Sequence, residues 1–200
     1  MDALCSQVQE DVAVMRKSQT DSTSLKFDDW LSAIHLCSPG HWAAEDKIGK
    51  NFISIHTPVP GLEKINQNAS KLVDAMIHKG PFVRFVWGFG SDNRLNHHPN
   101  PSPGVSEIEW RGRKFDQETS EKMGTCPFYL RVERQITWGL PALNAAIFTI
   151  RISFIDGNQI KFHPEQNRQL KTALASMTPE GRVYKGVETQ TSEILDWLES

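Results

Sequence analysis

Three apolar stretches decide the fold, namely FVRFVWGFG (residues 82–90), PFYLRVERQIT (127–137) and NAAIFTIRISFI (144–155). Each stretch is rich in β-branched and aromatic residues, which is typical of β-strands. Leu140-Pro141 interrupts the chain between the second stretch and the third, and the polar turn Asp156-Gly157-Asn158 follows the third. We therefore expect three consecutive antiparallel strands in the second half of the chain.

The first half of the chain predicts two further strands and several helices. The strands are expected in VQEDVAVM (8–15) and in LKFDDWLSAIHLC (25–37), where Pro39-Gly40 stops the second. Residues 41–56 suit short helical turns, and residues 62–79 predict a longer helix that ends at Gly80-Pro81. The apolar face of that helix is expected to contain Leu62, Ile65, Ala69, Leu72, Val73 and Met76. Two helices are expected at the C-terminus, over residues 164–177 and 188–200.

This order of elements predicts an α+β fold, with an antiparallel sheet, helices over one of its faces and C-terminal helices. The order resembles that of a PAS domain, in which short helices close over one sheet face and form a cradle for a small ligand. We expect residues 1–160 to form this PAS-like domain. Residues 161–200 are expected to be a helical extension that packs on the same domain.

The composition is that of an ordinary soluble globular protein. Of the 200 residues, 38% are hydrophobic, and 22 basic residues against 24 acidic ones give a net charge of −2. We therefore expect no nucleic-acid partner. No apolar run approaches the roughly 20 residues of a membrane-spanning helix, and MDALCSQVQEDV does not resemble a signal peptide, so we expect a cytoplasmic protein without a membrane partner. The three cysteines are widely spaced, which favours reduced thiols.

His56 is the first candidate ligand of a metal or haem. It follows the apolar run 52–55 and precedes Thr57-Pro58-Val59-Pro60, so two prolines restrict the backbone after it. A rigid backbone suits an imidazole that must point in one direction. A histidine satisfied by hydrogen bonds at the entry to a helix fits the same pattern. His35, Cys37, His41, His97 and His98 are weaker metal candidates, because their spacing matches no zinc motif.

Arg134 is a candidate because alternation along 128–136 places it in a row with Phe128, Leu130, Val132 and Ile136. A guanidinium in an apolar row needs an acceptor such as a carboxylate, a propionate or bound oxygen. A structural ion pair with Glu133 or Asp92 is an equally good interpretation. Glu133 itself alternates to the opposite face of the strand.

Arg84 and Arg151 are single charges in strands otherwise rich in Phe, Ile and Val. With Arg134 and Glu133 they are candidates for the polar floor of a pocket that holds an anionic cofactor or an oxygen-derived ligand. Each arginine fits an exposed position equally well. Trp87 lies in the same strand as Arg84 and is a further candidate to bind the cofactor, although a strand tryptophan is more often a core residue.

Four segments together resemble one family in the same order along the chain: GKNFISIHTPVPG (49–61), FYLRVERQITWGLP (128–141), AAIFTIRISF (145–154) and VYKG (183–186). This is the alpha-subunit family of haem-dependent oxidative N-demethylases, the dimethylamine-oxidising enzymes. The resemblance extends over most of the chain. Members of the family usually carry a substantial region before the point at which this sequence begins.

The resemblance implies a PAS-like domain that binds haem b, where O2 is activated and a small methylated amine loses a methyl group as formaldehyde. NADPH, FMN and a 2Fe-2S cluster would act through partner subunits, a flavin and iron–sulfur reductase. His56 would be the axial ligand of the haem iron. Arg134 would polarise iron-bound oxygen, Glu133 would neutralise the substrate ammonium, and Arg84 and Arg151 would pair with the haem propionates.

Two other classes of function fit the same sequence. One is a haem-binding PAS domain that senses a gas without catalysis, since a fold does not fix a function. The other is a haem-free domain that binds a ligand or a partner protein.

Overall fold

The computed structural model describes residues 2–18, 28–100, 102–104 and 127–200. The helices and strands in chain order are α1 (Asp2–Cys5), β1 (Asp11–Lys17), β2 (Asp29–His35), η1 (Ala44–Asp46), α2 (Phe52–His56), α3 (Glu63–Asn66), α4 (Ala69–His78), β3 (Phe82–Gly90), β4 (Tyr129–Leu140), η2 (Pro141–Leu143), β5 (Ala145–Asp156), α7 (Gly157–Lys161), α8 (Pro164–Ala175), α9 (Pro179–Tyr184) and α10 (Thr191–Glu199). None of the helices in this part of the chain is long and apolar enough to cross a membrane.

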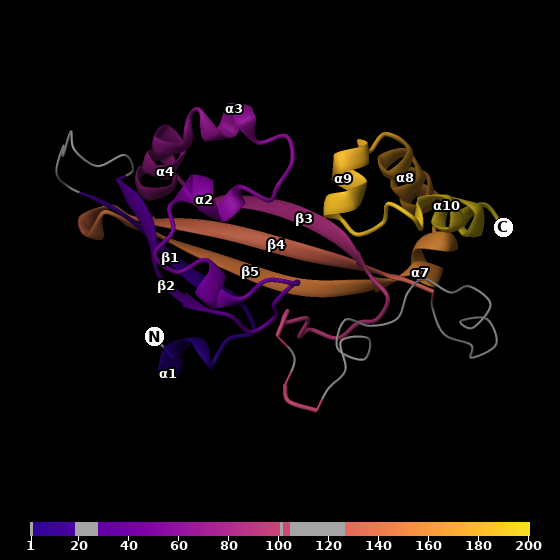
Figure 1. Cartoon of the computed structure of the whole chain (residues 1–200), viewed down its shortest axis with the longest axis horizontal. Helices are drawn as coiled ribbons and strands as arrows, with labels where there is room; N and C mark the ends of the chain where they lie inside the picture. Colours follow the sequence, from indigo (N-terminus) through magenta and orange to yellow (C-terminus); the bar gives the residue numbers. More distant parts are fainter. Residues whose placement is uncertain (1, 19–27, 101, 105–126) are drawn as a thin grey trace. The chain divides into compact units, whose positions relative to one another are not determined.

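The strands form a five-stranded antiparallel sheet in the order β2-β1-β5-β4-β3 (Figure 1). The mixed α+β fold predicted from the sequence is therefore confirmed, while the likeness to a PAS domain stays a prediction. The three consecutive strands predicted in the second half of the chain correspond to β3, β4 and β5. β4 ends three residues beyond its predicted end. Met15 of β1 pairs with Leu31 of β2 on one side and with Ala146 of β5 on the other.

The chain divides into two compact units. The first comprises residues 1–86, 95–100 and 133–152, and the second comprises residues 87–94, 101–132 and 153–200. The predicted division at residue 160 stays a prediction.

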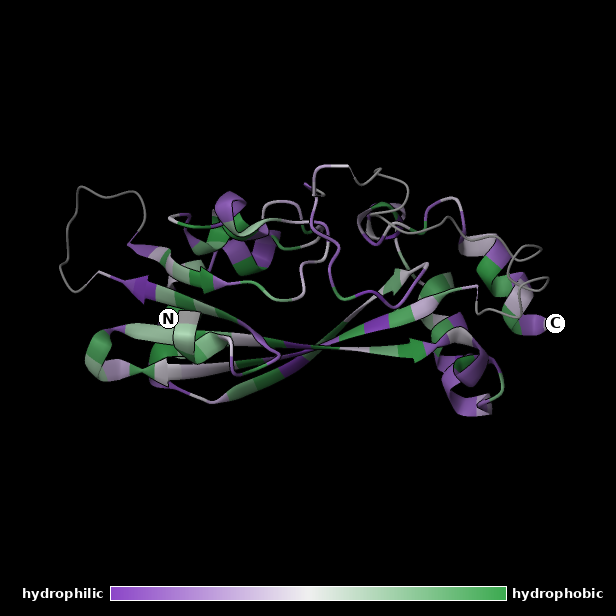
Figure 2. Ribbon diagram, turned by 90° about the horizontal axis from the view of Figure 1, so that it is seen from below, coloured by the Kyte–Doolittle hydropathy of each residue, from purple (hydrophilic) through white to green (hydrophobic). Residues whose placement is uncertain are grey.

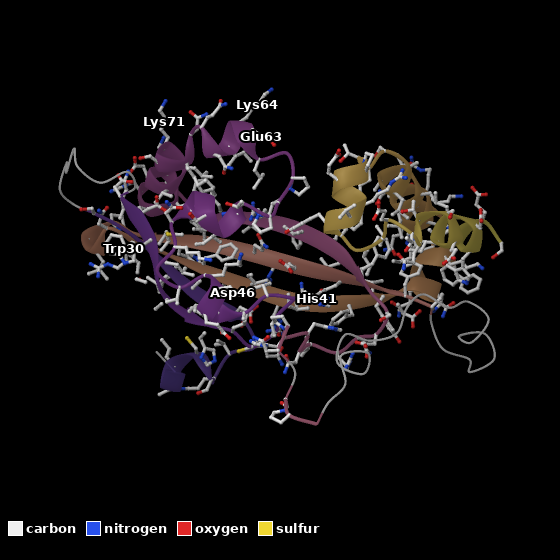
Figure 3. The ribbon with its side chains drawn as sticks, in the orientation of Figure 1. Trp30, His41, Asp46, Glu63, Lys64 and Lys71 are labelled. Atoms are coloured by element: carbon white, nitrogen blue, oxygen red, sulfur yellow. The ribbon has the colours of Figure 1, made fainter. Side chains whose placement is uncertain are left out.

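In the first unit, α2 and α4 pack on one face of the sheet. Their shared core consists of Met15, Phe52, Ala69, Val73, Ile77 and Ala146. Gly139 of β4 lies so close to the last turn of α4 that an added Cβ would stand 2.7 Å from the Ile77 carbonyl carbon. The charged side chains of Lys64 and Lys71 point away from this face (Figure 3).

The helix predicted over 62–79 is two helices, α3 and α4, separated at Gln67 and Asn68. Asparagine interrupts a helix readily, because its side chain bonds the nearby backbone; here Asn68 donates to the Lys64 carbonyl. The buried positions of α4 are Ala69, Val73 and Ile77, four residues apart. Ile65 and Leu72, which were expected on the apolar face of one helix, are both exposed.

In the second unit, α7, α8 and α10 contribute to a hydrophobic core. The buried members of this core are Phe128, Ile160, Leu170, Leu174, Val187, Ile194, Trp197 and Leu198. Figure 2 shows polar and apolar residues alternating along these helices, as expected where one side of each helix is buried. Two helices were not predicted: Asp156 caps α7, and Thr178 with Pro179 begins α9 inside a segment expected to be a connection.

Candidate functional site

His56 is the last residue of the short helix α2, whose N-cap is Asn51. The Asn51 side chain caps the helix by accepting a hydrogen bond from the Ser54 N–H at 2.8 Å. One turn later, His56 Nδ1 lies 2.8 Å from the Phe52 carbonyl oxygen. Because a carbonyl oxygen only accepts, this bond places the proton on Nδ1 and leaves the lone pair on Nε2. The helix therefore presents Nε2 as the nitrogen that can bind a ligand.

Burial keeps the His56 imidazole neutral. Desolvation is the largest influence and lowers its pKa below the usual value of 6.5. The Phe52 carbonyl opposes this shift, and the positive charges of Arg84 and Lys47 add to it. At neutral pH the ring thus retains the lone pair that coordination to a metal requires.

Lys47 is one of two cations whose charge acts on His56. Its Nζ donates to the Ile55 carbonyl at 2.9 Å, so the ammonium lies beside the last turn of α2. Burial lowers the pKa of Lys47, with a smaller contribution from Lys50 that Asp46 opposes. The sequence analysis did not select Lys47, because one lysine in a polar segment is an ordinary surface residue.

Arg84 begins a row of polar side chains on β3 and β4. Its Nε donates to Gln135 Oε1 at 2.6 Å, and Gln135 Nε2 donates to Glu133 Oε2 at 2.7 Å. Gln135 is buried at 7% exposure, so both ends of its amide are used within the protein. The charge of Arg84 also acts on His56. The structure thus connects two predicted candidates, Arg84 and Glu133, through a glutamine that was not predicted.

Arg134 lies on the other side of β4 from this row. Glu133 and Gln135 share one face, and the alternation of the strand turns Arg134 to the opposite face, where it is exposed. The prediction that Arg134 occupies a buried apolar row is therefore wrong. The prediction that Arg134 and Glu133 face opposite sides is confirmed.

Trp87 and Arg151 lie in other surroundings. Trp87 packs against the core of the second unit, with its ring 5.8 Å from that of Phe89. Lys185 stands over the Trp87 ring at 4.5 Å, and its ammonium donates to the Trp87 carbonyl oxygen. Arg151 is exposed and pairs with Glu10 at 3.2 Å. Trp87 thus lies against a core and Arg151 is exposed, which are the alternatives that the sequence also allowed for these residues. Their predicted roles in cofactor binding stay predictions.

The weaker metal candidates include one pair of neighbours. The rings of His41 and His97 lie 5.2 Å apart, and the His41 N–H donates to the His97 carbonyl at 2.8 Å. Across the described part of the chain, no group of three or more His, Cys, Asp or Glu side chains is arranged to hold a metal ion.

Comparison with known families adds evidence that is independent of this geometry. A family model described as "Haem-dependent oxidative N-demethylase, alpha subunit-like" matches residues 1–195 of the 200-residue chain. The match includes His56, Arg84, Glu133, the whole first unit and the second unit as far as residue 195. The description of these proteins as alpha subunits implies a complex of several subunits.

Proposed function

We propose that this chain binds haem b through His56 and removes a methyl group from a small amine. The proposal starts from its family, because the chain belongs to the haem-dependent oxidative N-demethylase alpha-subunit-like family. The observation that carries this proposal is the hydrogen bond between His56 Nδ1 and the Phe52 carbonyl. A histidine that ligates a metal typically uses its other ring nitrogen in such a bond.

The surroundings of His56 suit a flat apolar group with an anionic edge. The apolar side chains of Phe52, Ile53 and Ile55 lie in or against the core of the first unit, on the helix that ends at His56. Lys47 and Arg84 both act on His56 as positive charges. Haem has apolar faces and two carboxylates, and in this proposal the two cations pair with the propionates. Arg84 would pair with one haem propionate, as expected from the sequence. Lys47 would pair with the other propionate, in place of Arg151.

Glu133 is the residue that we assign to the substrate. A small methylated amine is a cation at neutral pH and needs a negative partner when it leaves water. The Gln135 amide holds the Glu133 carboxylate, and Arg84 holds the amide in turn. Glu133 keeps the role expected from the sequence, whereas Arg134 has no role in this proposal, because it is exposed on the opposite face of β4.

Haem b, when bound, supplies the iron at which O2 is activated. Over the whole reaction, O2, electrons and protons are consumed, and the demethylated amine, formaldehyde and water are released. The chain's own residues then have three tasks. His56 presents Nε2 in a fixed direction, Lys47 and Arg84 neutralise the anionic edge of the cofactor, and Glu133 binds the ammonium. The electrons come from NADPH through FMN and a 2Fe-2S cluster on a partner reductase.

Titration of the purified chain with haem, followed by absorption spectroscopy, tests the first part of the proposal. We expect the Soret band of the added haem to shift and sharpen in the wild type, and haem binding to weaken by at least about tenfold in His56→Gly. Added imidazole should restore the wild-type spectrum of that variant. His78→Gly is the matched control, because His78 makes the same bond to the carbonyl four residues earlier, Asp74, but is exposed.

A folded wild type that leaves the Soret band of free haem unchanged would refute haem binding. An absorption spectrum of His56→Gly identical to that of the wild type would refute the assignment of His56 as the ligand of the haem iron.

Formaldehyde release tests the enzymatic part. We expect the haem-loaded chain, given a chemical reductant, O2 and dimethylamine, to release formaldehyde, and we expect Glu133→Gln to raise the KM for the amine. Reversible O2 binding without formaldehyde would instead indicate a gas sensor.

A further inference from the structure

The start of α2 is tied to the sheet by one buried carboxylate. Asp29, the first residue of β2, is 8% exposed, and its Oδ2 accepts a hydrogen bond from the Phe52 N–H at 2.6 Å. Phe52 is the first residue of α2, so its N–H has no partner within the helix. Asp29 therefore satisfies a backbone group that the helix itself leaves open.

Phe52 joins this carboxylate to His56. Its N–H is held by Asp29, its carbonyl is held by His56 Nδ1, and its ring lies 4.3 Å from the imidazole ring. Both polar groups of one peptide residue are thus fixed, one by the sheet and one by the candidate ligand. A displacement of the Phe52 backbone would move the carbonyl that determines which nitrogen of His56 carries the proton.

The length of α2 makes this anchor necessary. A helix of five residues has too few internal hydrogen bonds to persist without tertiary contacts. Backbone bonds between Leu31 and the segment 49–50 fix the chain before the helix, the Asn51 side chain holds the Ser54 N–H, and Asp29 holds the Phe52 N–H. Of these contacts, only that of Asp29 acts directly on the residue that bonds to His56.

We propose that Asp29 is a positioning residue for His56. Acting through Phe52, Asp29 keeps the proton of the imidazole on Nδ1 and leaves Nε2 free to coordinate a metal. Its relevance to haem rests on the proposed function, whereas the effect on the imidazole is a property of the chain alone. Burial raises the pKa of Asp29, and the Phe52 N–H opposes that shift, which agrees with a carboxylate held in place by its hydrogen bond.

The test is made first on the haem-free protein, by NMR of the imidazole nitrogens, with the His56 signal assigned from its loss in His56→Gln. Asp29→Asn keeps an acceptor beside Phe52, and Asp29→Leu keeps the size but has no acceptor. Asp28→Ala is the matched control, because it removes the neighbouring carboxylate, which faces Lys17 at 3.3 Å. Should Asp29→Leu fail to fold, Asp29→Ala takes its place, since alanine has no side-chain acceptor either.

We expect the Nδ1–H form in the wild type, in Asp28→Ala and in Asp29→Asn, and a mixture of both forms in the variant without an acceptor. Haem affinity should fall by about tenfold in that variant only. A folded variant without an acceptor that keeps the Nδ1–H form would overturn the inference, even if haem binds through His56. A change of tautomer in a protein that binds no haem would support the inference and refute the proposed function instead.

Discussion

Replacement of Gly139 by alanine should destabilise the first unit strongly. The added Cβ would stand 2.7 Å from the Ile77 carbonyl carbon and 3.0 Å from the Met76 oxygen, and it would overlap the Ile77 oxygen. Ordinary contacts between carbon atoms are about 3.5 Å or more, so the strand and the helix would have to separate by about 1 Å. The obstacle is backbone rather than a side chain that can rotate away. Overpacking of this kind costs about 3 kcal/mol.

Thermal unfolding followed by circular dichroism measures this cost. At about 2–4 °C per kcal/mol for a chain of this size, Gly139→Ala should lower the Tm by about 6–12 °C. Gly88→Ala is the matched control, because Gly88 also lies in a strand but an added Cβ there meets nothing within 4 Å. The control should change stability by less than about 0.5 kcal/mol. If Gly139→Ala and Gly88→Ala had the same Tm, α4 would not lie against β4 as described.

Three further outcomes are expected. Burial raises the pKa of Asp29 above its usual 3.8, so the stability contributed by its protonated form is fully present below pH 3.8 and is lost as the pH rises through the folded pKa. Urea unfolding over that range should show the wild type losing stability relative to Asp29→Asn. A difference between the two proteins that does not change with pH would contradict this. Leu174→Ala should cost about 3 kcal/mol in urea unfolding, because Leu174 is fully buried, whereas Phe162→Ala at 79% exposure should cost less than about 0.5 kcal/mol. Lys185→Gln should change the fluorescence of Trp87 and cost about 1 kcal/mol, because it removes the cation over that ring; an unchanged emission spectrum would argue against the contact.

The strands could be predicted from the sequence because their signal is local. β3 occupies the predicted residues 82–90, and β5 differs by one residue from the predicted 144–155. Both are runs of β-branched and aromatic residues between glycine, proline, asparagine or aspartate, so propensity and boundary agree.

The short helices could not be predicted in this way, because caps rather than periodicity determine them. α7 has five residues and α9 has six, which is too short for an apolar repeat. Their signals are Asp156, which accepts from the Asn158 N–H, and Thr178 followed by Pro179 at the first helical position. A search for N-caps would have found α9, where threonine and proline stand together.

The candidate site shows what alternation determines and what it leaves open. Alternation correctly separates Glu133 from Arg134, but the covered face depends on helices far away in the sequence. The apolar neighbours of Arg134 suggested that its side of β4 faces the core. The row that contacts α4 is instead the one with Gln135, Thr137 and Gly139, where glycine admits the helix backbone.

A buried polar side chain is costly unless it is hydrogen-bonded, and buried Gln135 meets that condition through its bonds to exposed Arg84 and to half-buried Glu133. A covered row that keeps polar residues despite this cost is better evidence for a site than one charge among apolar neighbours. Because the sequence does not show which side of β4 is covered, only the burial of Gln135 in the structure favours Glu133 over Arg134.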